Sequence, residues 1–261
     1  MSTATTPVIP KDVIDAYRKF PLWIVWSFGQ RAGLNCATGV ALPIKREWRI
    51  CGPAVTMRVI PIQDTHKYND NTSADFEHSL HTLVRLADRG DVMVLDMGGD
   101  TEYTLFGGTV AKDAKYFGCD GAVIDGMHRD TAELLECDFP MFSRGGANPD
   151  GHGRYRTANL NDEAVRIGSI SIAPGDLVLG DMDGVVVVPR DRILEFLPAL
   201  QQAQERNDQS YEHWKKTGEF FYRDRPRPAG DHWQQSIDII DPKLIKNLVP
   251  GQWRRGEKPP G

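Results

Sequence analysis

Gly118-Cys-Asp-Gly-Ala-Val-Ile-Asp-Gly-Met-His-Arg-Asp-Thr-Ala-Glu133 contains a short apolar run between two glycine turns. Its core, Ala122-Val-Ile124, predicts a buried strand that ends at the following Asp-Gly pair. Beyond the strand the chain turns into a helix and places Arg129, Asp130 and Glu133 at that turn. A guanidinium beside two carboxylates at the end of a buried strand is costly unless these groups bind something.

The spacing of the two acids allows two interpretations. Asp130 and Glu133 are three residues apart, so a helix that starts near Asp130 has both carboxylates on one face, just after Arg129. A divalent cation suits that arrangement. The alternative is a capping box, with Asp130 as the N-cap, Glu133 as the third helical residue and Arg129 as their salt-bridge partner. Spacing alone favours the capping box.

The preceding segments predict how this turn is surrounded. Gly90-Asp-Val-Met-Val-Leu-Asp96 is a second apolar strand, entered through a Gly-Asp turn. Phe106-Gly-Gly-Thr-Val-Ala-Lys-Asp-Ala-Lys-Tyr-Phe-Gly118 indicates a helix opened by two glycines and closed by one. Bare N–H groups at such an opening form an anion site for a carboxylate or a phosphate. The polar groups of this strand, loop, helix, strand and helix unit therefore gather at strand ends.

Several segments in the same order resemble the RraA-like superfamily, which includes the 4-hydroxy-4-methyl-2-oxoglutarate (pyruvate) aldolases and oxaloacetate decarboxylases. They cover most of residues 50–190. The matching segments are Cys51-Gly-Pro-Ala-Val-Thr56, Gly90–Asp96, Gly107-Gly-Thr-Val-Ala111, Gly121-Ala-Val-Ile-Asp-Gly-Met-His-Arg-Asp130, Phe139-Pro-Met-Phe142, Pro174-Gly-Asp176 and Gly180-Asp-Met-Asp-Gly-Val-Val-Val-Val-Pro189. The chain of matches is specific for the superfamily and weak for substrate.

One position departs from the aldolase pattern. In the well-known aldolases of the family an Asp stands twenty-one positions before the Arg of Arg-Asp, and Gly108 occupies that position here. A variant of the family has Gly there and an acid three residues after the Asp, as this chain does. The resemblance therefore implies Asp130 as a metal ligand, Glu133 as the second acid, and Arg129 as the contact to substrate and enolate. Arg129 and Asp130 are the expected catalytic residues, and the substrate is expected at Arg129 and the helix opening of Gly107, Gly108, Thr109 and Val110.

The resemblance also implies a fold and an assembly. The expected fold class is α/β, a three-layer β/β/α swivelling-type domain with extra N- and C-terminal helices. We expect an N-terminal helix and aromatic segment over 1–45, the RraA-like catalytic domain over 46–190, and a C-terminal helix and tail over 191–261 that pack on the same or a neighbouring subunit. Family members assemble as homotrimers or homohexamers, with the active site near a subunit boundary.

Composition narrows the class of protein. The chain has 261 residues with 40% hydrophobic content, enough for a sizeable core. A net charge of −5 without a long basic run argues against nucleic acid as a partner. We find no apolar run long enough for a membrane helix and no signal-like start, so we expect a cytoplasmic protein without membrane contact. Cys36, Cys51, Cys119 and Cys137 lack metal or redox spacing, which predicts reduced thiols.

Other residues are weaker candidates for the site. Arg144 and His152 lie in a glycine-rich loop that relatives place near the substrate mouth, although a surface crossover fits equally well. His128 titrates near neutral pH and is adjacent to the site, but an extended backbone would point it away from Arg129. Asp176, with the nearby Asp181 and Asp183, better fits turn capping than metal binding.

The aromatic segment Leu22-Trp-Ile-Val-Trp-Ser-Phe28 replaces a family landmark that usually contains Ser-Asp-Ala. We expect Trp23, Trp26 and Phe28 in the core or in a subunit interface rather than stacked on a ligand.

The chemistry of such a site favours a lyase. A cation held by one or two carboxylates keeps positions open, as Mg²⁺ or Mn²⁺ sites do, so a 2-oxo acid can chelate it. Charge that develops on the keto oxygen is then stabilised by the metal and Arg129. Aldol cleavage and oxaloacetate decarboxylation both yield a pyruvate enolate, so the sequence predicts a metal-dependent aldolase or decarboxylase. The alternatives are a non-catalytic regulator of a ribonuclease and another enolate chemistry, isomerisation or hydration of a hydroxy acid.

Overall fold

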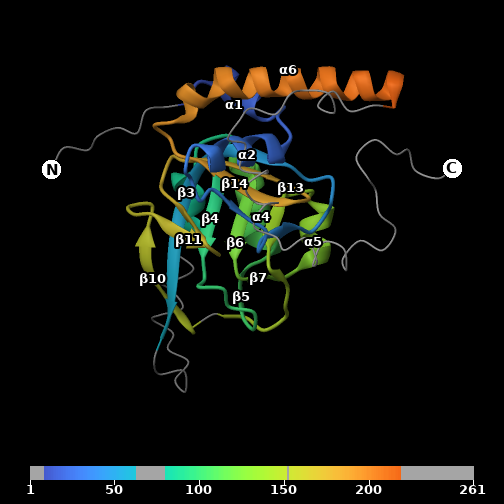
Figure 1. Ribbon diagram of the computed structural model, residues 1–261. Helices are drawn as coiled ribbons and strands as arrows, with labels where there is room; N and C mark the ends of the chain where they lie inside the picture. Colours follow the sequence, from blue (N-terminus) through green and yellow to red (C-terminus); the bar gives the residue numbers. More distant parts are fainter. Residues whose placement is uncertain (1–8, 63–79, 152, 219–261) are drawn as a thin grey trace, which may run out of the picture. The chain divides into compact units, whose positions relative to one another are not determined.

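The computed structural model describes residues 9–62, 80–151 and 153–218 (Figure 1). It divides into two compact units, one up to Arg206 and one from Asn207 onward, and helix α6 (Ile193–Thr217) contains the dividing point. Every strand discussed below belongs to the first unit. Among the described residues, no helix has both the length and the apolar character that crossing a membrane requires.

A parallel sheet with two buried faces lies at the centre of the first unit. Its strands, in spatial order, are β3 (Ile50–Pro61), β4 (Val92–Asp96), β6 (Gly121–Asp125) and β8 (Met141–Ser143) (Figure 1). Along β4, Val92 and Val94 pack into one hydrophobic cluster and Met93 and Leu95 into another. Because successive side chains point to opposite faces, a strand covered on both sides is apolar throughout, as this stretch is.

Antiparallel strands extend and curl this sheet. On one side of the parallel sheet, β13 (Leu177–Asp181) pairs with β3, β14 (Gly184–Val188) pairs with β13, and β1 (Ala37–Thr38) pairs with β14. At the other end, β2 (Leu42–Pro43) pairs with β8. A further strand, β10 (Tyr155–Leu160), also pairs with β3. The hairpin of β11 (Val165–Ile167) and β12 (Ile170–Ile172) packs on the same cluster as Val92 and Val94. The predicted turn at Asp183-Gly184 joins β13 to β14, as expected.

Helices cover the opposite face. The helical residues 80–86, α4 (Gly108–Phe117) and α5 (Thr131–Glu136) pack against the cluster that contains Met93 and Leu95. Gly118 ends α4 in the left-handed conformation, at φ 87°, which glycine adopts without steric cost. The layers are therefore sheet, sheet and helix, and the predicted three-layer α/β fold is confirmed.

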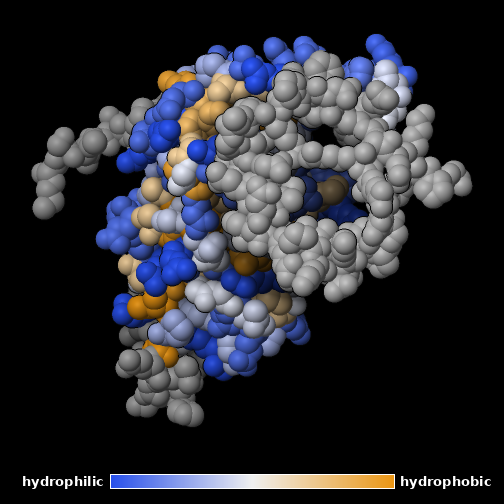
Figure 2. All heavy atoms as spheres, viewed as in Figure 1, coloured by the Kyte–Doolittle hydropathy of each residue, from blue (hydrophilic) through white to orange (hydrophobic). Residues whose placement is uncertain are grey.

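The N-terminal segment forms two helices, α1 (Lys11–Tyr17) and α2 (Leu22–Arg31), which pack on β13, β14 and the start of α6. The aromatic segment is helical, a form that its sequence pattern did not predict. Phe28 packs edge-on against Phe196 at 4.8 Å between ring centroids. Trp23 and Trp26 remain 51% and 42% exposed, so they do not belong to the core of the single chain. On the face drawn in Figure 2, apolar residues form patches separated by polar ones.

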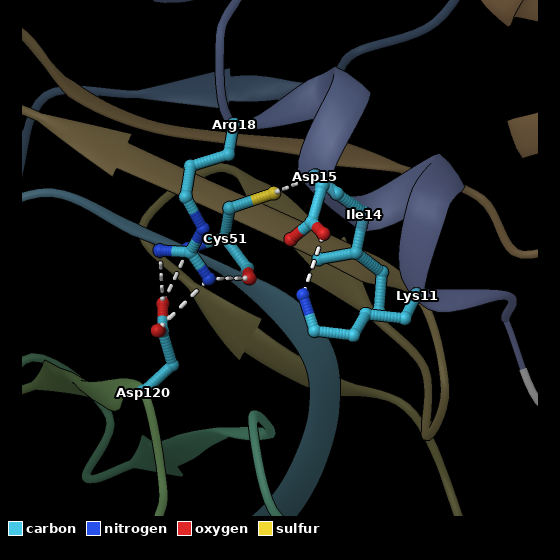
Figure 3. A network of polar contacts seen from close by, with 6 residues as sticks. All are labelled: Lys11, Ile14, Asp15, Arg18, Cys51 and Asp120. Atoms are coloured by element: carbon cyan, nitrogen blue, oxygen red, sulfur yellow. Dashed lines mark hydrogen bonds and ion pairs between the residues drawn. The ribbon is translucent and has the colours of Figure 1, made fainter.

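An ion-pair network fastens α1 to the sheet (Figure 3). Arg18 donates from Nη1 and Nη2 to the carboxylate of Asp120, at 3.0 and 2.9 Å, and from Nη2 to the Cys51 carbonyl at 2.7 Å. The Cys51 N–H donates to the same carboxylate at 2.7 Å. One carboxylate before β6 thus holds both α1 and the start of β3.

Two smaller predictions are confirmed. The cysteines are free thiols, and burial raises the pKa of Cys51 to about 12 and that of Cys119 to about 11, which makes both poor nucleophiles. Asp176 accepts hydrogen bonds from the N–H groups of Ala173 and Arg190, as a turn-capping acid does.

Candidate active site

The acids at the ends of the central strands hold the fold together. Asp96 and Asp125 end β4 and β6, face each other in register, and are 3% and 4% exposed. Asp96 accepts a hydrogen bond from the N–H of Arg166 at 3.0 Å, and Asp125 accepts one from the N–H of Gly168 at 2.8 Å. Asp125 also accepts Nε of Arg144 at 2.5 Å. These carboxylates therefore anchor the β11–β12 hairpin.

A small parallel sheet brings the starts of α4 and α5 together. It consists of β5 (Thr104–Phe106), β7 (Met127–His128) and β9 (Gly145–Gly146) (Figure 1). The N–H of Arg129 donates to the carbonyl of Phe106 at 3.0 Å. The residues that follow β7 thus lie beside the glycines that open α4.

The side chain of Asp130 hydrogen-bonds to the start of α4 rather than to α5, the helix that it precedes. It occupies the N-cap position of α5 in the left-handed conformation, at φ 57°, and makes no side-chain hydrogen bond to α5. Its Oδ2 instead accepts the N–H of Gly108 at 3.0 Å. The capping-box interpretation is therefore wrong. A left-handed Asp costs on the order of 1 kcal/mol, and the carboxylate it directs to α4 meets the positive end of that helix dipole.

Glu133 occupies the space that glycine leaves at the start of α4. Its Oε2 lies 2.5 Å from Nζ of Lys112. A Cβ atom on Gly108 would be 2.4 Å from the same Oε2, and one on Gly107 would be 2.3 Å from Oδ2 of Asp130. Such distances do not occur between real atoms, so both carboxylates depend on the two glycines.

Arg129 is held by acids on two sides. Its Nη1 pairs with the carboxylate of Asp150. Its Nε lies 3.6 Å from Oδ2 of Asp130, is buried, and has no hydrogen-bond acceptor among the residues that the structure describes. The side chain is 35% exposed, so the guanidinium is steered by its surroundings and remains accessible to an anion.

The other predicted residues take different places. His128 is buried, with Nδ1 2.8 Å from Oγ of Ser143 and Nε2 2.9 Å from Oγ1 of Thr131, and burial lowers its pKa. Arg144 pairs with the strand-end carboxylate of Asp125. His152 lies outside the described residues. A site role for any of these three residues stays a prediction.

Two residues of the site were missed. Lys112 follows Gly108 by one helical turn on α4, so helical spacing offered a signal for it. Asp150 comes from the loop after β9, which pairs with β5 through Thr104: the N–H of Gly151 donates to the Thr104 carbonyl at 2.8 Å. Nothing local in the sequence connects Asp150 with Arg129.

The donor set suits a hard cation that keeps several waters. Among residues 9–62, 80–151 and 153–218, no three His, Cys, Asp or Glu side chains form a metal cluster. Mg²⁺ needs only one or two carboxylates, however, and Asp130 and Glu133 offer two at neighbouring glycines. The N–H groups of Thr109 and Val110 are in the first turn of α4 and have no acceptor within the helix, so they suit a carboxylate ligand.

Known proteins resemble this chain in sequence and in fold. A Halalkalibacterium halodurans protein, named provisionally as a 4-hydroxy-4-methyl-2-oxoglutarate aldolase, is 33% identical over 172 residues, 66% of this chain and 75% of that protein. A structure described as novel cellulases from microbes of the gut ecosystem has a TM-score of 0.69 at 26% identity, over 80% of this chain and 91% of that one. Streptomyces coelicolor RraAS2, described as an unusual member of the RNase ES inhibitor RraA protein family, has a TM-score of 0.68 at 19% identity, over 81% and 98%.

The family model described as RraA-like, Aldolase/RraA, matches residues 11–187. That range contains the parallel sheet, both glycines of α4 and the Arg129-Asp130 pair. The chain therefore belongs to the RraA-like (Aldolase/RraA) family.

Proposed function

We propose that the protein is a divalent-metal-dependent carbon–carbon lyase that cleaves or decarboxylates a small 2-oxo acid. The observation that carries the proposal is the convergence of Asp130, Glu133 and Arg129 at the N-terminus of α4. The provisional aldolase name of the Halalkalibacterium halodurans relative supports the same reaction class.

Each group has a role in that chemistry. Asp130 and Glu133 hold the cation, Mg²⁺ or Mn²⁺, which when bound supplies Lewis-acid stabilisation to the keto oxygen of a 2-oxo acid. The N–H groups of Thr109 and Val110 bind and orient the substrate carboxylate. The guanidinium of Arg129 stabilises the negative charge that develops as the carbon–carbon bond breaks and pyruvate enolate forms.

The two cleavages differ in their need for a base. An aldol cleavage must remove the proton of the 4-hydroxyl group, whereas decarboxylation of oxaloacetate requires no such step. Both ring nitrogens of His128 contact hydroxyl groups, of Ser143 and Thr131, so we assign it no proton transfer. Decarboxylation therefore makes the smaller demand on the residues around Arg129.

A regulatory function is the second candidate. RraAS2 is described as belonging to a family of ribonuclease inhibitors, and its likeness to this chain is one of fold. A surface that only binds protein has no need for a left-handed Asp that directs its carboxylate into a glycine-lined helix opening. Another enolate chemistry, isomerisation or hydration of a hydroxy acid, would use the same groups as the lyase.

The test is release of pyruvate, coupled to lactate dehydrogenase, from oxaloacetate and from 4-hydroxy-4-methyl-2-oxoglutarate. Each substrate is supplied with Mg²⁺ or Mn²⁺, with and without chelator, and the cleavage that free metal causes is subtracted. We expect turnover that chelator abolishes and that Asp130→Ala lowers at least about 100-fold. Glu136→Gln, an exposed acid on α5, is the matched control and should keep full activity.

The outcomes separate the candidates. Activity that survives both chelation and Asp130→Ala would rule out the metal mechanism. Turnover of neither acid, together with a ribonuclease that copurifies in stoichiometric amount, would establish the regulator instead.

A further inference from the structure

We propose that Lys112 competes with the divalent cation for Glu133 and so sets the metal affinity of the site. The proposal rests on the proposed function in one respect, namely that Asp130 and Glu133 bind the cation. It adds a residue to which neither the family motif nor the sequence analysis assigns a role.

The geometry places the ammonium group of Lys112 on the oxygen atom of Glu133 that faces Gly108. Nζ of Lys112 is 2.5 Å from Oε2 of Glu133, and that same oxygen is the atom nearest to a Cβ built on Gly108. Gly108 is the first residue of α4, and Lys112 follows one turn later on the same face. The carboxylate is thus held between the backbone of α4 and an ammonium group of the same helix.

A cation that takes Oε2 as a ligand must displace this ammonium. An ammonium group is a compact point charge that donates up to three hydrogen bonds, so it uses the lone pairs that a metal would use. Two positive charges on one oxygen also repel each other. The competition follows from charge and position, because a cation bound to this carboxylate would lie beside the ammonium group that already pairs with it.

The ammonium is held weakly enough to be displaced. The Lys112 side chain is 55% exposed and that of Glu133 is 46% exposed. Ion pairs this accessible to solvent contribute little, so we expect removal of the ammonium to tighten metal binding only about 3- to 10-fold. The competition therefore adjusts the affinity without closing the site.

Asp130 differs from Glu133 in this respect. Its Oδ2 contacts the N–H of Gly108 and lies 3.6 Å from Nε of Arg129, and no ammonium group contacts it among the described residues. We therefore assign Asp130 as the constant ligand and Glu133 as the conditional one.

Helix α4 supplies a matched control. Lys115 also reaches from α4 to α5, but its Nζ contacts the carbonyl oxygens of Cys137 and Asp138. Removing this lysine deletes the same charge from the same helix and leaves Oε2 of Glu133 unchanged.

The experiment measures Mn²⁺ binding to the full chain by calorimetry and by the electron paramagnetic resonance signal of free Mn²⁺. We expect Lys112→Met to bind Mn²⁺ about 3- to 10-fold more tightly than wild type, and Lys115→Met to change the affinity less than about twofold. In a Glu133→Gln background, Lys112→Met should have no such effect, since the contested oxygen no longer carries charge. Thermal melting without added metal checks that every variant is folded.

The possible failures are distinguishable. If wild type binds Mn²⁺ and Lys112→Met binds it equally well or more weakly, Lys112 does not compete and this proposal is wrong while the proposed function stands. If the two proteins bind Mn²⁺ no better than Asp130→Ala does, both proposals fail. Tightening that persists in the Glu133→Gln background would also overturn the competition, because the effect would then be one of general charge.

Discussion

Gly108 leaves the space at the start of α4 that Glu133 occupies, since a Cβ atom there would be 2.4 Å from Oε2 of Glu133. We predict that Gly108→Asp lowers the free energy of unfolding by about 1–3 kcal/mol, as overpacking does. Adding Glu133→Ala should recover most of this loss, because it removes the side chain that clashes and transfers the second acid to α4. Urea unfolding of both variants is the measurement. A single variant as stable as wild type would show that Glu133 moves away without cost.

Asp150 is the counter-ion of Arg129, so under the proposed function it competes with the negative charge that Arg129 would stabilise in the substrate. We predict that Asp150→Asn, which keeps a hydrogen-bond acceptor, strengthens pyruvate binding about 3- to 10-fold because one negative charge near the guanidinium is removed. Calorimetry with pyruvate measures the effect, and Glu136→Gln is the control. Weaker binding in Asp150→Asn would instead assign Asp150 the role of orienting Arg129.

At the scale of elements, one ion pair adds a polar anchor to the apolar packing of α1. Arg18 and Asp120 are 37% and 21% exposed, and the same carboxylate also binds the N–H of Cys51 (Figure 3). We predict that Asp120→Ala costs about 2–3 kcal/mol in urea unfolding, because the half-buried guanidinium of Arg18 loses its counter-ion and keeps only the Cys51 carbonyl, while the N–H of Cys51 loses its acceptor. The exposed pair of Lys11 and Asp15 is the comparison, and Asp15→Asn should leave the urea midpoint close to that of wild type. Equal losses in both variants would contradict the anchoring role.

The start of β4 carries an acid that opposes folding at neutral pH. Burial raises the pKa of Asp91 to about 6, so between about pH 4 and 6 the folded chain binds a proton that the unfolded chain does not. Stability therefore falls as pH rises through that window. We predict that Asp91→Asn is more stable than wild type at pH 7.5, by about 1 kcal/mol after allowance for solvent screening.

The measurement for Asp91 is urea unfolding of both proteins at pH 4.5 and 7.5. The stability of Asp91→Asn relative to wild type should increase as pH rises. Burial lowers the pKa of His128, which removes stability as pH falls and so acts in the opposite direction. The contribution of His128 is the same in the variant and in wild type, so it cancels when their unfolding free energies are subtracted. A gain that does not change with pH would mean that Asp91 is ionised at the same pH in both states.

At the scale of the whole molecule, Trp23 and Trp26 border a cavity of about 250 Å³ beside β1 and β14. The sequence predicted that these tryptophans lie in the core or in a subunit interface. Both are exposed in the single chain, so we expect them in a subunit interface. We expect light scattering to give three or six times the 29.2 kDa chain mass, and Trp23→Asp with Trp26→Asp to lower it. Tyr116→Asp, at an 83% exposed aromatic, is the control. An unchanged mass in the double variant would place the interface elsewhere.

The sequence by itself determined the elements and the family. Continuous apolar runs predicted the buried strands at β4 and β6, glycines predicted both ends of α4, and these segments in order identified the RraA-like fold. The helical form of the Trp23 segment was missed, since its apolar residues are too dense to show a helical period.

Only the tertiary structure decided which partner each charged side chain takes. Asp130 reaches Gly108, Glu133 reaches Lys112, Arg129 reaches Asp150 and Arg144 reaches Asp125, across separations of 19 to 22 residues. Spacing in a sequence reports contacts between residues three or four apart, which is why it favoured a capping box that does not form. The contacts of Asp130 and Glu133 arise instead where α4 and α5 pack side by side, because Gly107 and Gly108 leave space at the start of α4 that the two carboxylates fill.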